Sequence, residues 1–151
     1  MNFKNLDSIN QKILDLLTKD SRISYAEIAR QTHLSRVAVR ERINNLISAG
    51  IITQFTTVVQ AEKVGFPLSV FLEVGVEPNK MISVAKSLVA QDKVKIVYQM
   101  TGSTALHVHA FMEDNDSLVD FLQKHVYTID GITNVEISML LKRFKSDLTV
   151  M

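Results

Sequence analysis

Residues 20–50 read DSRISYAEIARQTHLSRVAVRERINNLISAG, a pattern that predicts two short helices joined by a tight turn. Ser24 is a good N-cap, and Glu27 three residues later completes a capping-box pattern. The turn region ends at Ser35, a second N-cap placed directly before a new periodic run. Gly50 follows that run and marks its end. The stretch therefore predicts a helix, a turn and a second helix.

The second helix has an apolar side and a polar side. Val39, Ile43 and Leu46 are spaced i, i+4 and i+7, so they share one inward-facing stripe. In the major groove of DNA, arginine recognises guanine and asparagine recognises adenine. A helix with its apolar stripe packed away and such side chains presented outward is suited to reading DNA. The outward residues are Arg36, Arg40, Glu41 and Asn44.

The residues that we expect to contact DNA lie on this helix and at the starts of both helices. Backbone N–H groups and hydroxyls at helix starts can hold phosphates. For the two serines in this set, a role in capping alone is at least as well supported. The expected set is Arg22, Ser24, Tyr25, Ser35, Arg36, Val37, Ala38, Arg40, Glu41 and Asn44.

A competing interpretation is that this charged surface has no nucleic-acid role. Small three-helix units with a charged outer face occur in many proteins that never bind DNA, because charged runs are usually solvated. Arg42 is treated separately, since it lies at the edge of the inward stripe. We expect Arg42 to pair with a carboxylate rather than to read a base.

A further helix is predicted upstream. Asp7 can cap it, and three helices that close on one another form the minimal helix-turn-helix unit. The inner face of this first helix comprises Ile9, Ile13, Leu16 and Leu17.

Composition restricts the class of protein. With 151 residues, of which 46% are hydrophobic, the chain can form one ordinary domain or two small ones. It has no cysteine, no apolar run of eighteen residues and no signal-peptide pattern at its start. These features predict a soluble, cytoplasmic protein without disulfides and with no membrane partner.

The charge is unevenly distributed. Residues 1–52 hold eight Lys/Arg and five Asp/Glu, a net +3, whereas residues 53–151 hold nine and eleven, a net −2. The cationic excess therefore lies in the segment with the helix-turn-helix pattern, where phosphate contacts would need it.

Beyond residue 52 the helical period gives way to strands. Alternating residues in 68–76 indicate a strand with one buried face. Residues 53–60 are rich in β-branched residues and predict a strand that doubles as a linker. The other predicted elements are a helix that opens at Pro78–Asn79 and carries Met81 to Leu88, strands over 95–101 and 105–112, a helix capped by Asn115 or Asp116, and a strand over 135–141.

The order of these elements is βαββαβ, a ferredoxin-like arrangement in which both helices cover the same sheet face. The predicted fold is α+β: a winged-helix-like helix-turn-helix domain (1–52), a strand linker (53–64) and a ferredoxin-like βαββαβ domain with a dimerisation face (65–151). The uncovered sheet face is expected to be apolar enough to pair with a second copy. That face comprises Ser69, Phe71, Glu73, Val97, Gln99, His107, His109, Phe111, Glu136, Ser138 and Leu140.

The whole chain resembles the Lrp/AsnC family of transcription regulators. The resemblance is carried by Leu6-Asp7, Ile13-Leu14, residues 20–24, Glu27-Ile-Ala29, Leu34-Ser35, Glu41-Arg-Ile43, Leu46, Gly50-Ile-Ile52, Gly65, Thr101-Gly102 and Gly131-Ile132. It implies a sequence-specific regulator that binds double-stranded DNA. It further implies homodimers, assembling in turn into tetramers or octamers, and a small effector, usually an amino acid, held between dimers.

The resemblance places the effector at the turn between the second and third strands. The family commonly has Thr-Gly-Asp-Tyr-Asp there, whereas this chain has Thr101, Gly102, Ser103, Thr104 and Ala105. The acidic groups that could pair with an ammonium group are replaced by neutral hydroxyls, which form weaker hydrogen bonds. On the last strand, Ser138 is the nearest hydroxyl. Either the ligand is bound differently, or it is not an ordinary amino acid, or this chain needs none.

No cofactor, metal or catalytic site is expected. His107 and His109 are two residues apart on a strand and could form half of a metal site, but no further ligands lie nearby in sequence. The alternative function is a siroheme-decarboxylase-like enzyme on the same architecture. Against it, the second domain has only one arginine, Arg143. A third option is an effector-sensing assembly module whose DNA role is secondary.

Overall fold

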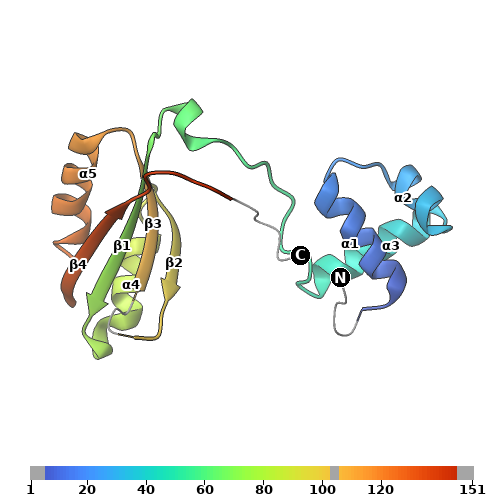
Figure 1. The fold of residues 1–151 in the computed structure, drawn as a ribbon. Coiled ribbons are helices and arrows are strands. Elements are labelled where there is room, and N and C mark those ends of the chain that lie inside the picture. The colour runs from blue at the N-terminus through green and yellow to red at the C-terminus, as the bar shows by residue number, and fades with distance from the viewer. Residues whose placement is uncertain (1–5, 103–105, 146–151) are drawn as a thin grey trace. The chain divides into compact units, whose positions relative to one another are not determined.

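The computed structural model describes residues 6–102 and 106–145, which form two compact units (Figure 1). The first unit extends to Val58 and the second runs from Val59 to Lys145. The boundary falls inside the expected linker segment, residues 53–64.

The first unit consists of three helices, α1 (Ser8–Lys19), α2 (Tyr25–Thr32) and α3 (Arg36–Ser48). Their inward faces form one core, as the apolar spacing predicts. Ile9 and Leu16 lie at the margin of this core, and Leu14, absent from the predicted inner face, is buried in it. The fully buried side chains of the core are Ile13, Ile28, Val39 and Ile43.

All three helices begin at the predicted caps. The side-chain oxygens of Asp7, Ser24 and Ser35 accept hydrogen bonds from backbone N–H groups three residues later, at 2.7, 3.1 and 3.1 Å. These bonds satisfy donors that a helix start would otherwise leave unpaired.

The capping box predicted at Ser24 is only half formed. The carboxylate of Glu27 does not return to the helix start. It accepts hydrogen bonds from Arg30, at 3.0 and 2.6 Å, and from Gln31 at 2.6 Å. The hydrogen bond from Arg30, followed by that from Gln31, lowers the pKa of Glu27 to about 2. A charged donor one turn ahead binds the carboxylate more strongly than a neutral backbone N–H does.

Arg42 links α3 to the start of α1. Its guanidinium donates to the Asp7 carboxylate at 2.6 Å and to the Asn10 side-chain oxygen at 3.0 Å. The hydrogen bond from Arg42, followed by that from the Asn10 backbone, lowers the pKa of Asp7. The prediction that Arg42 pairs with a carboxylate is confirmed, and Asp7 acts both as a helix cap and as an inter-helix tie.

Residues 53–60 form no strand in the structure and are exposed, contrary to the sequence prediction. A strand requires a neighbouring strand for its backbone N–H and C=O groups. The described part of this chain offers no such neighbour to this segment.

The second unit is a four-stranded antiparallel sheet with helices, in the strand order β2-β3-β1-β4 (Figure 1). The predicted βαββαβ order is confirmed. The elements are η1 (Ala61–Val64), β1 (Leu68–Val76), η2 (Pro78–Lys80), α4 (Met81–Val89), β2 (Val94–Gln99), β3 (Leu106–Met112), α5 (Asn115–Phe121), the π-helical turn η3 (Leu122–Val126) and β4 (Ile132–Met139).

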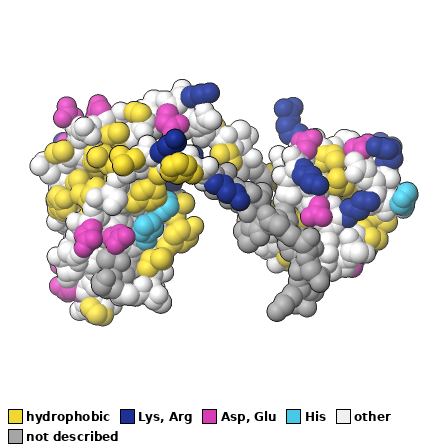
Figure 2. Space-filling view, in the orientation of Figure 1, with side chains coloured by type: hydrophobic (Ala, Val, Ile, Leu, Met, Phe, Trp, Pro, Cys, Tyr) yellow, Lys and Arg dark blue, Asp and Glu magenta, His cyan; other side chains and the backbone are white. Residues whose placement is uncertain are grey.

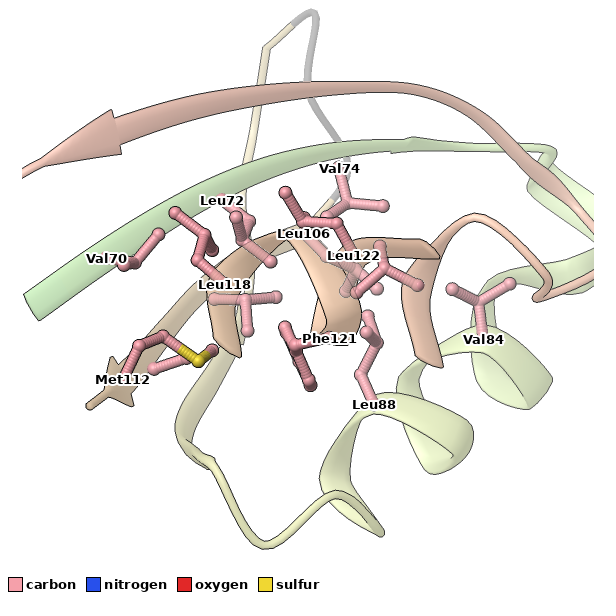
Figure 3. Close-up of a cluster of buried hydrophobic side chains, with 13 residues drawn as sticks. Val70, Leu72, Val74, Val84, Leu88, Leu106, Met112, Leu118, Phe121 and Leu122 are labelled. Carbon is pink, nitrogen blue, oxygen red and sulfur yellow. The ribbon is translucent and has the colours of Figure 1, made fainter. Parts of the chain in front are cut away.

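Both helices cover the same sheet face, as the right-handed crossovers require (Figure 3). Val70, Leu72 and Val74 of β1 meet Val84 and Leu88 of α4 in one core. The side chains of α5 and η3 complete it: Leu118, Phe121, Leu122 and Val126. Burial of these apolar groups is the main stabilising term for this unit.

Three local predictions need correction. The cap of α5 is Asp114 rather than Asn115 or Asp116, because its carboxylate accepts from the Ser117 backbone N–H at 2.7 Å. The last strand, β4, begins at Ile132, three residues before the start of the strand predicted over 135–141. Among the described residues of both units, no helix is long and apolar enough to cross a membrane.

The third correction concerns the faces of β2. The register shifts between Val94 and Ile96, so this strand has a bulge. A bulge inserts one residue and inverts the alternation beyond it. Val97 therefore packs on the core, and Gln99 lies opposite the core residue Leu106 rather than on the uncovered face.

Replacement of Asp7 should separate its two roles. We expect Asp7→Ala to destabilise the three-helix unit by about 1–2 kcal/mol, because the cap is lost. Asp7→Asn keeps a capping oxygen and loses only the charge, so its cost should be below about 1 kcal/mol. Hydrogen exchange of α1 and α3 amides reports this unit separately. Equal effects of the two changes would mean that the cap contributes nothing.

Gly131→Ala tests the close approach at the start of β4. Gly131 has φ +96, and an added Cβ would lie 2.5 Å from Cβ of Lys80. Gly65 has φ +95 with nothing within 4 Å, so Gly65→Ala is the matched control. Both changes should cost roughly 1–2 kcal/mol in backbone strain. Gly131→Ala should cost about 1–3 kcal/mol more, measured by urea unfolding. Identical midpoints would contradict the clash.

Candidate functional site

Helix α3 presents a polar surface opposite its buried stripe. Arg36, Arg40, Glu41 and Asn44 are exposed, and Val37 is 68% exposed. Ala38 is half-buried at the edge of this surface. The arrangement combines hydrogen-bond donors, an acceptor and apolar groups, which are the features that base edges and the thymine methyl group match.

The arginines of the first unit divide into two kinds. Arg30 and Arg42 are held by carboxylates at 2.6 Å. Among the described side chains, Arg36 and Arg40 have no ion-pair partner. Guanidinium groups that no carboxylate of the unit occupies keep their donors available for an external acceptor.

The helix starts offer donors beside this surface. The hydroxyls of Ser24 and Ser35 act as capping acceptors, and each retains its own O–H as a donor. Capping and phosphate contact are therefore compatible for these serines. Tyr25 is 41% exposed at the start of α2, and Arg22 is exposed in the preceding turn. These are the positions from which phosphates would be contacted.

Of the predicted effector residues, the structure describes Thr101, Gly102 and Ser138, and it does not bring Ser138 together with the other two within one chain. Thr101 and Gly102 are exposed, and Gly102 has φ +118. Ser103, Thr104 and Ala105 lie outside the described residues. Ser138 lies on β4, opposite Phe71. Since β3 and β4 are separated by β1, Ser138 lies roughly 10 Å across the sheet from β3, level with His109, and roughly 10 Å along the strand from Leu106, beyond which the turn begins.

The uncovered sheet face carries an aromatic cluster. Phe71 contacts His109 with ring centroids 4.5 Å apart, and His107 lies 4.8 Å from His109. Tyr98 joins the cluster at 6.4 Å from His109. Figure 2 shows histidine side chains among hydrophobic ones on this unit. Sequence alternation missed Tyr98 and Ile96 because of the bulge in β2.

Burial, followed by the nearby His107, lowers the pKa of His109. Because the pKa of His109 is lower in the folded state, protonation of this side chain in acid destabilises the fold. The free energy of unfolding is therefore unaffected by His109 above the ordinary histidine pKa of about 6.5 and falls as the pH drops below it. Within residues 6–102 and 106–145, no three potential metal ligands come together.

Comparison with known proteins covers almost the entire chain. Residues 6–47 match the AsnC-type helix-turn-helix domain, and residues 69–150 match the Lrp/AsnC ligand binding domain. The transcriptional regulator LrpA of Pyrococcus abyssi is 31% identical over 140 residues, which cover 93% of this chain and 99% of that protein. FL11 of Pyrococcus furiosus, also a transcriptional regulator, is 32% identical, with 93% and 92% covered.

Solved structures agree with this match. AsnC of E. coli has a TM-score of 0.88 and 25% identity, covering 95% of this chain and 97% of that chain. A transcriptional regulator of Neisseria meningitidis, solved as a complex with L-Met, has a TM-score of 0.89 at 24% identity, with 97% of each chain covered. At that identity the second comparison shows the fold alone.

The matched families are those of regulators and not of enzymes, which decides against the decarboxylase alternative. The helix-turn-helix unit is the DNA-binding part, and the sheet unit is the ligand-binding part. The chain belongs to the Lrp/AsnC family of helix-turn-helix transcription regulators.

Proposed function

We propose that this regulator reads specific DNA sequences with the exposed side of α3. Arg36, Arg40 and Asn44 contact base edges, together with Val37 and Glu41. The observation that supports this assignment most strongly is the contrast between the arginines: Arg42 is held by Asp7, whereas no described carboxylate pairs with Arg40. A helix whose apolar stripe is fixed in a core presents its free donors in one direction, as groove reading requires.

Phosphate contacts come from the helix starts. Arg22, Ser24, Tyr25 and Ser35 flank the reading surface and are exposed. Contacts of this kind set the register of the protein on the duplex without reading its sequence. Ala38, half-buried, leaves room for the DNA backbone or a base edge to approach α3.

The functional assembly is at least a dimer, formed through the uncovered sheet face. Phe71, Phe111 and Leu140 are only half-buried there, and no helix of the unit covers them. Such an apolar face is stabilised by a second copy of itself, which gives a two-fold dimer. Pairing also doubles the cationic excess of the DNA-binding units. Tetramers or octamers would then place several α3 helices along one DNA molecule.

A small molecule such as an amino acid modulates this assembly. The support is the match of residues 69–150 to a ligand-binding domain and the L-Met complex of the Neisseria regulator. The effector favours one assembly state, and the assembly sets the spacing of the α3 helices on DNA. We place this effector between dimers, at residues 101–105 and Ser138.

Arg40→Ala tests base reading. In the full-length protein it should weaken binding to a selected DNA site by about 1–3 kcal/mol and relax the base preference at one position. Arg40→Lys keeps the charge but loses the planar fork, so the base preference should relax here too. Lys19→Ala, an exposed cation on α1, is the matched control and should change affinity slightly and equally for all sequences. Gel-shift titrations at fixed salt provide the measurement. Unchanged preference in Arg40→Ala would remove Arg40 from the reading set.

Phe71→Asp tests the dimer face. It places a carboxylate at the centre of the proposed interface, where two copies would bury unpaired charges. We expect monomers by light scattering, with the circular dichroism spectrum retained. Val119→Asp on the exposed surface of α5 is the control and should leave the dimer intact. A dimeric Phe71→Asp protein would show that another surface pairs.

A further inference from the structure

Two histidines on the uncovered face of the sheet lie close enough to share one ligand. His107 and His109 are two residues apart on β3, so both project from the face that no helix covers. Their ring centroids are 4.8 Å apart. Two imidazoles bound to one tetrahedral metal ion have centroids roughly 5 Å apart, because each metal–nitrogen bond is about 2.0 Å long. The two rings are therefore spaced like neighbouring ligands of a single metal ion.

Neighbouring aromatic side chains hold these rings in place. Phe71, directly opposite His109 on β1, contacts it edge-on with centroids 4.5 Å apart. Tyr98, directly opposite His107 on β2, lies 6.4 Å from His109. Both histidines are half-buried as a result. Packing that restricts the rotation of a side chain in this way preorganises it as a metal ligand.

The same face carries acidic groups without a counter-charge. A row of directly opposite residues crosses the sheet, one from each strand: Tyr98, His107, Glu73 and Glu136. Among the described side chains, Glu73 and Glu136 have no ion-pair partner. Figure 2 shows acidic side chains near the histidines of this unit. Like charges directly opposite each other on a sheet are destabilising, so a cation at the histidines would be favourable.

One chain supplies only half of such a site. Within residues 6–102 and 106–145 of one chain, no three potential ligands come together. The strand order β2-β3-β1-β4 places β3 and β1 at the centre of the sheet, so a two-fold axis through the centre of this face would pass close to His109. Paired sheets lie about 10 Å apart, and a histidine side chain extends by roughly half that distance. Imidazoles from both copies would therefore meet midway between the sheets.

We propose that the dimer binds one divalent transition-metal ion of the zinc class, with His107 and His109 of both copies as its four ligands. Imidazole suits this class of ion, and cysteine, the other common zinc ligand, is absent from the chain. The sequence offers no third or fourth ligand nearby, and pairing supplies both. The inference rests on the proposed function, because the site exists only where two sheet faces pair.

Charge distinguishes this site from simple packing of the two faces. Pairing without metal would bury Glu73 and Glu136 of both copies beside neutral imidazoles, which is costly for unpaired carboxylates. A dication at the centre offsets part of this charge. Because one copy offers two ligands and the pair offers four, the ion binds the dimer more tightly than the monomer. It must then strengthen pairing by the same factor, which makes assembly of the regulator responsive to metal.

The test is metal analysis of the untagged full-length protein after equilibration with Zn²⁺ and gel filtration. We expect one zinc ion per two chains, and Co²⁺ in its place should give the strong visible absorption of a tetrahedral ion. His107→Gln and His109→Gln each remove two of the four ligands and should weaken zinc binding more than about a hundredfold, beyond the effect of outer-shell changes. His125→Gln, at an exposed histidine of η3, is the matched control and should bind zinc normally.

Light scattering over a dilution series measures the coupling to assembly. A chelator should raise the dissociation constant of the wild-type dimer at least about tenfold, because the ion binds the paired state preferentially. The same chelator should have no effect on the His109→Gln protein. Circular dichroism checks that each variant is folded.

Three results would overturn the inference. One is a dimer that retains no zinc after gel filtration. Another is zinc retained in both His107→Gln and His109→Gln, which would mean adventitious binding elsewhere. The third is one zinc per chain with pairing unchanged by the chelator, which would mean that each copy binds metal alone. Light scattering separates this inference from the proposed function: a dimer without zinc contradicts only the metal site, whereas a monomer contradicts both.

Discussion

The burial of one stripe on α3 is the constraint on which the DNA-binding unit depends. Val39, Ile43 and Leu46 pack against α1 and α2, so the rotation of α3 about its own axis is fixed. With that rotation fixed, Arg40 points away from the core. Close packing makes this orientation hard to change, because any rotation would expose apolar surface and open a void.

Arg42, on the same helix, ties helices together. Its guanidinium is tied to the residue that caps α1, so the cap and the position of α3 are connected. Only one residue separates Arg40 from Arg42 in the sequence, yet Arg40 is exposed with no ion-pair partner among the described side chains, whereas Arg42 ties α3 to α1. The helical period decides between these roles, since residues two apart lie on different sides of a helix.

The sheet of the second unit is covered by helices on one face only. The other face holds Phe71, His107, His109 and Tyr98 beside acidic side chains. Exposure of the aromatic part of this face to water is unfavourable. The face is suited to a partner surface.

Much of the fold was predictable because it depends on local chemistry. The caps at Asp7, Ser24 and Ser35, the apolar stripe of α3 and the strand over 68–76 follow from side-chain type and spacing, which the sequence displays directly. The pairing of Arg42 with a carboxylate was also predictable, since a cation at the edge of a core needs a counter-charge. Only the identity of its partner, thirty-five residues away, required the structure.

Tertiary structure decided the features that depend on contacts between distant segments. The bulge in β2 moved Val97 to the core and Tyr98 to the open face, because the register of a strand is set by its neighbour. The absence of a strand over 53–60 has the same origin: β-branched residues favour an extended chain, but a ladder needs a partner. A cavity joins the η1 segment to the start of β2, about thirty residues further along, and to the end of β3, about fifty residues further along. Spacing along one segment reports its own period, whereas registers, cavities and ion pairs arise only where separate segments meet.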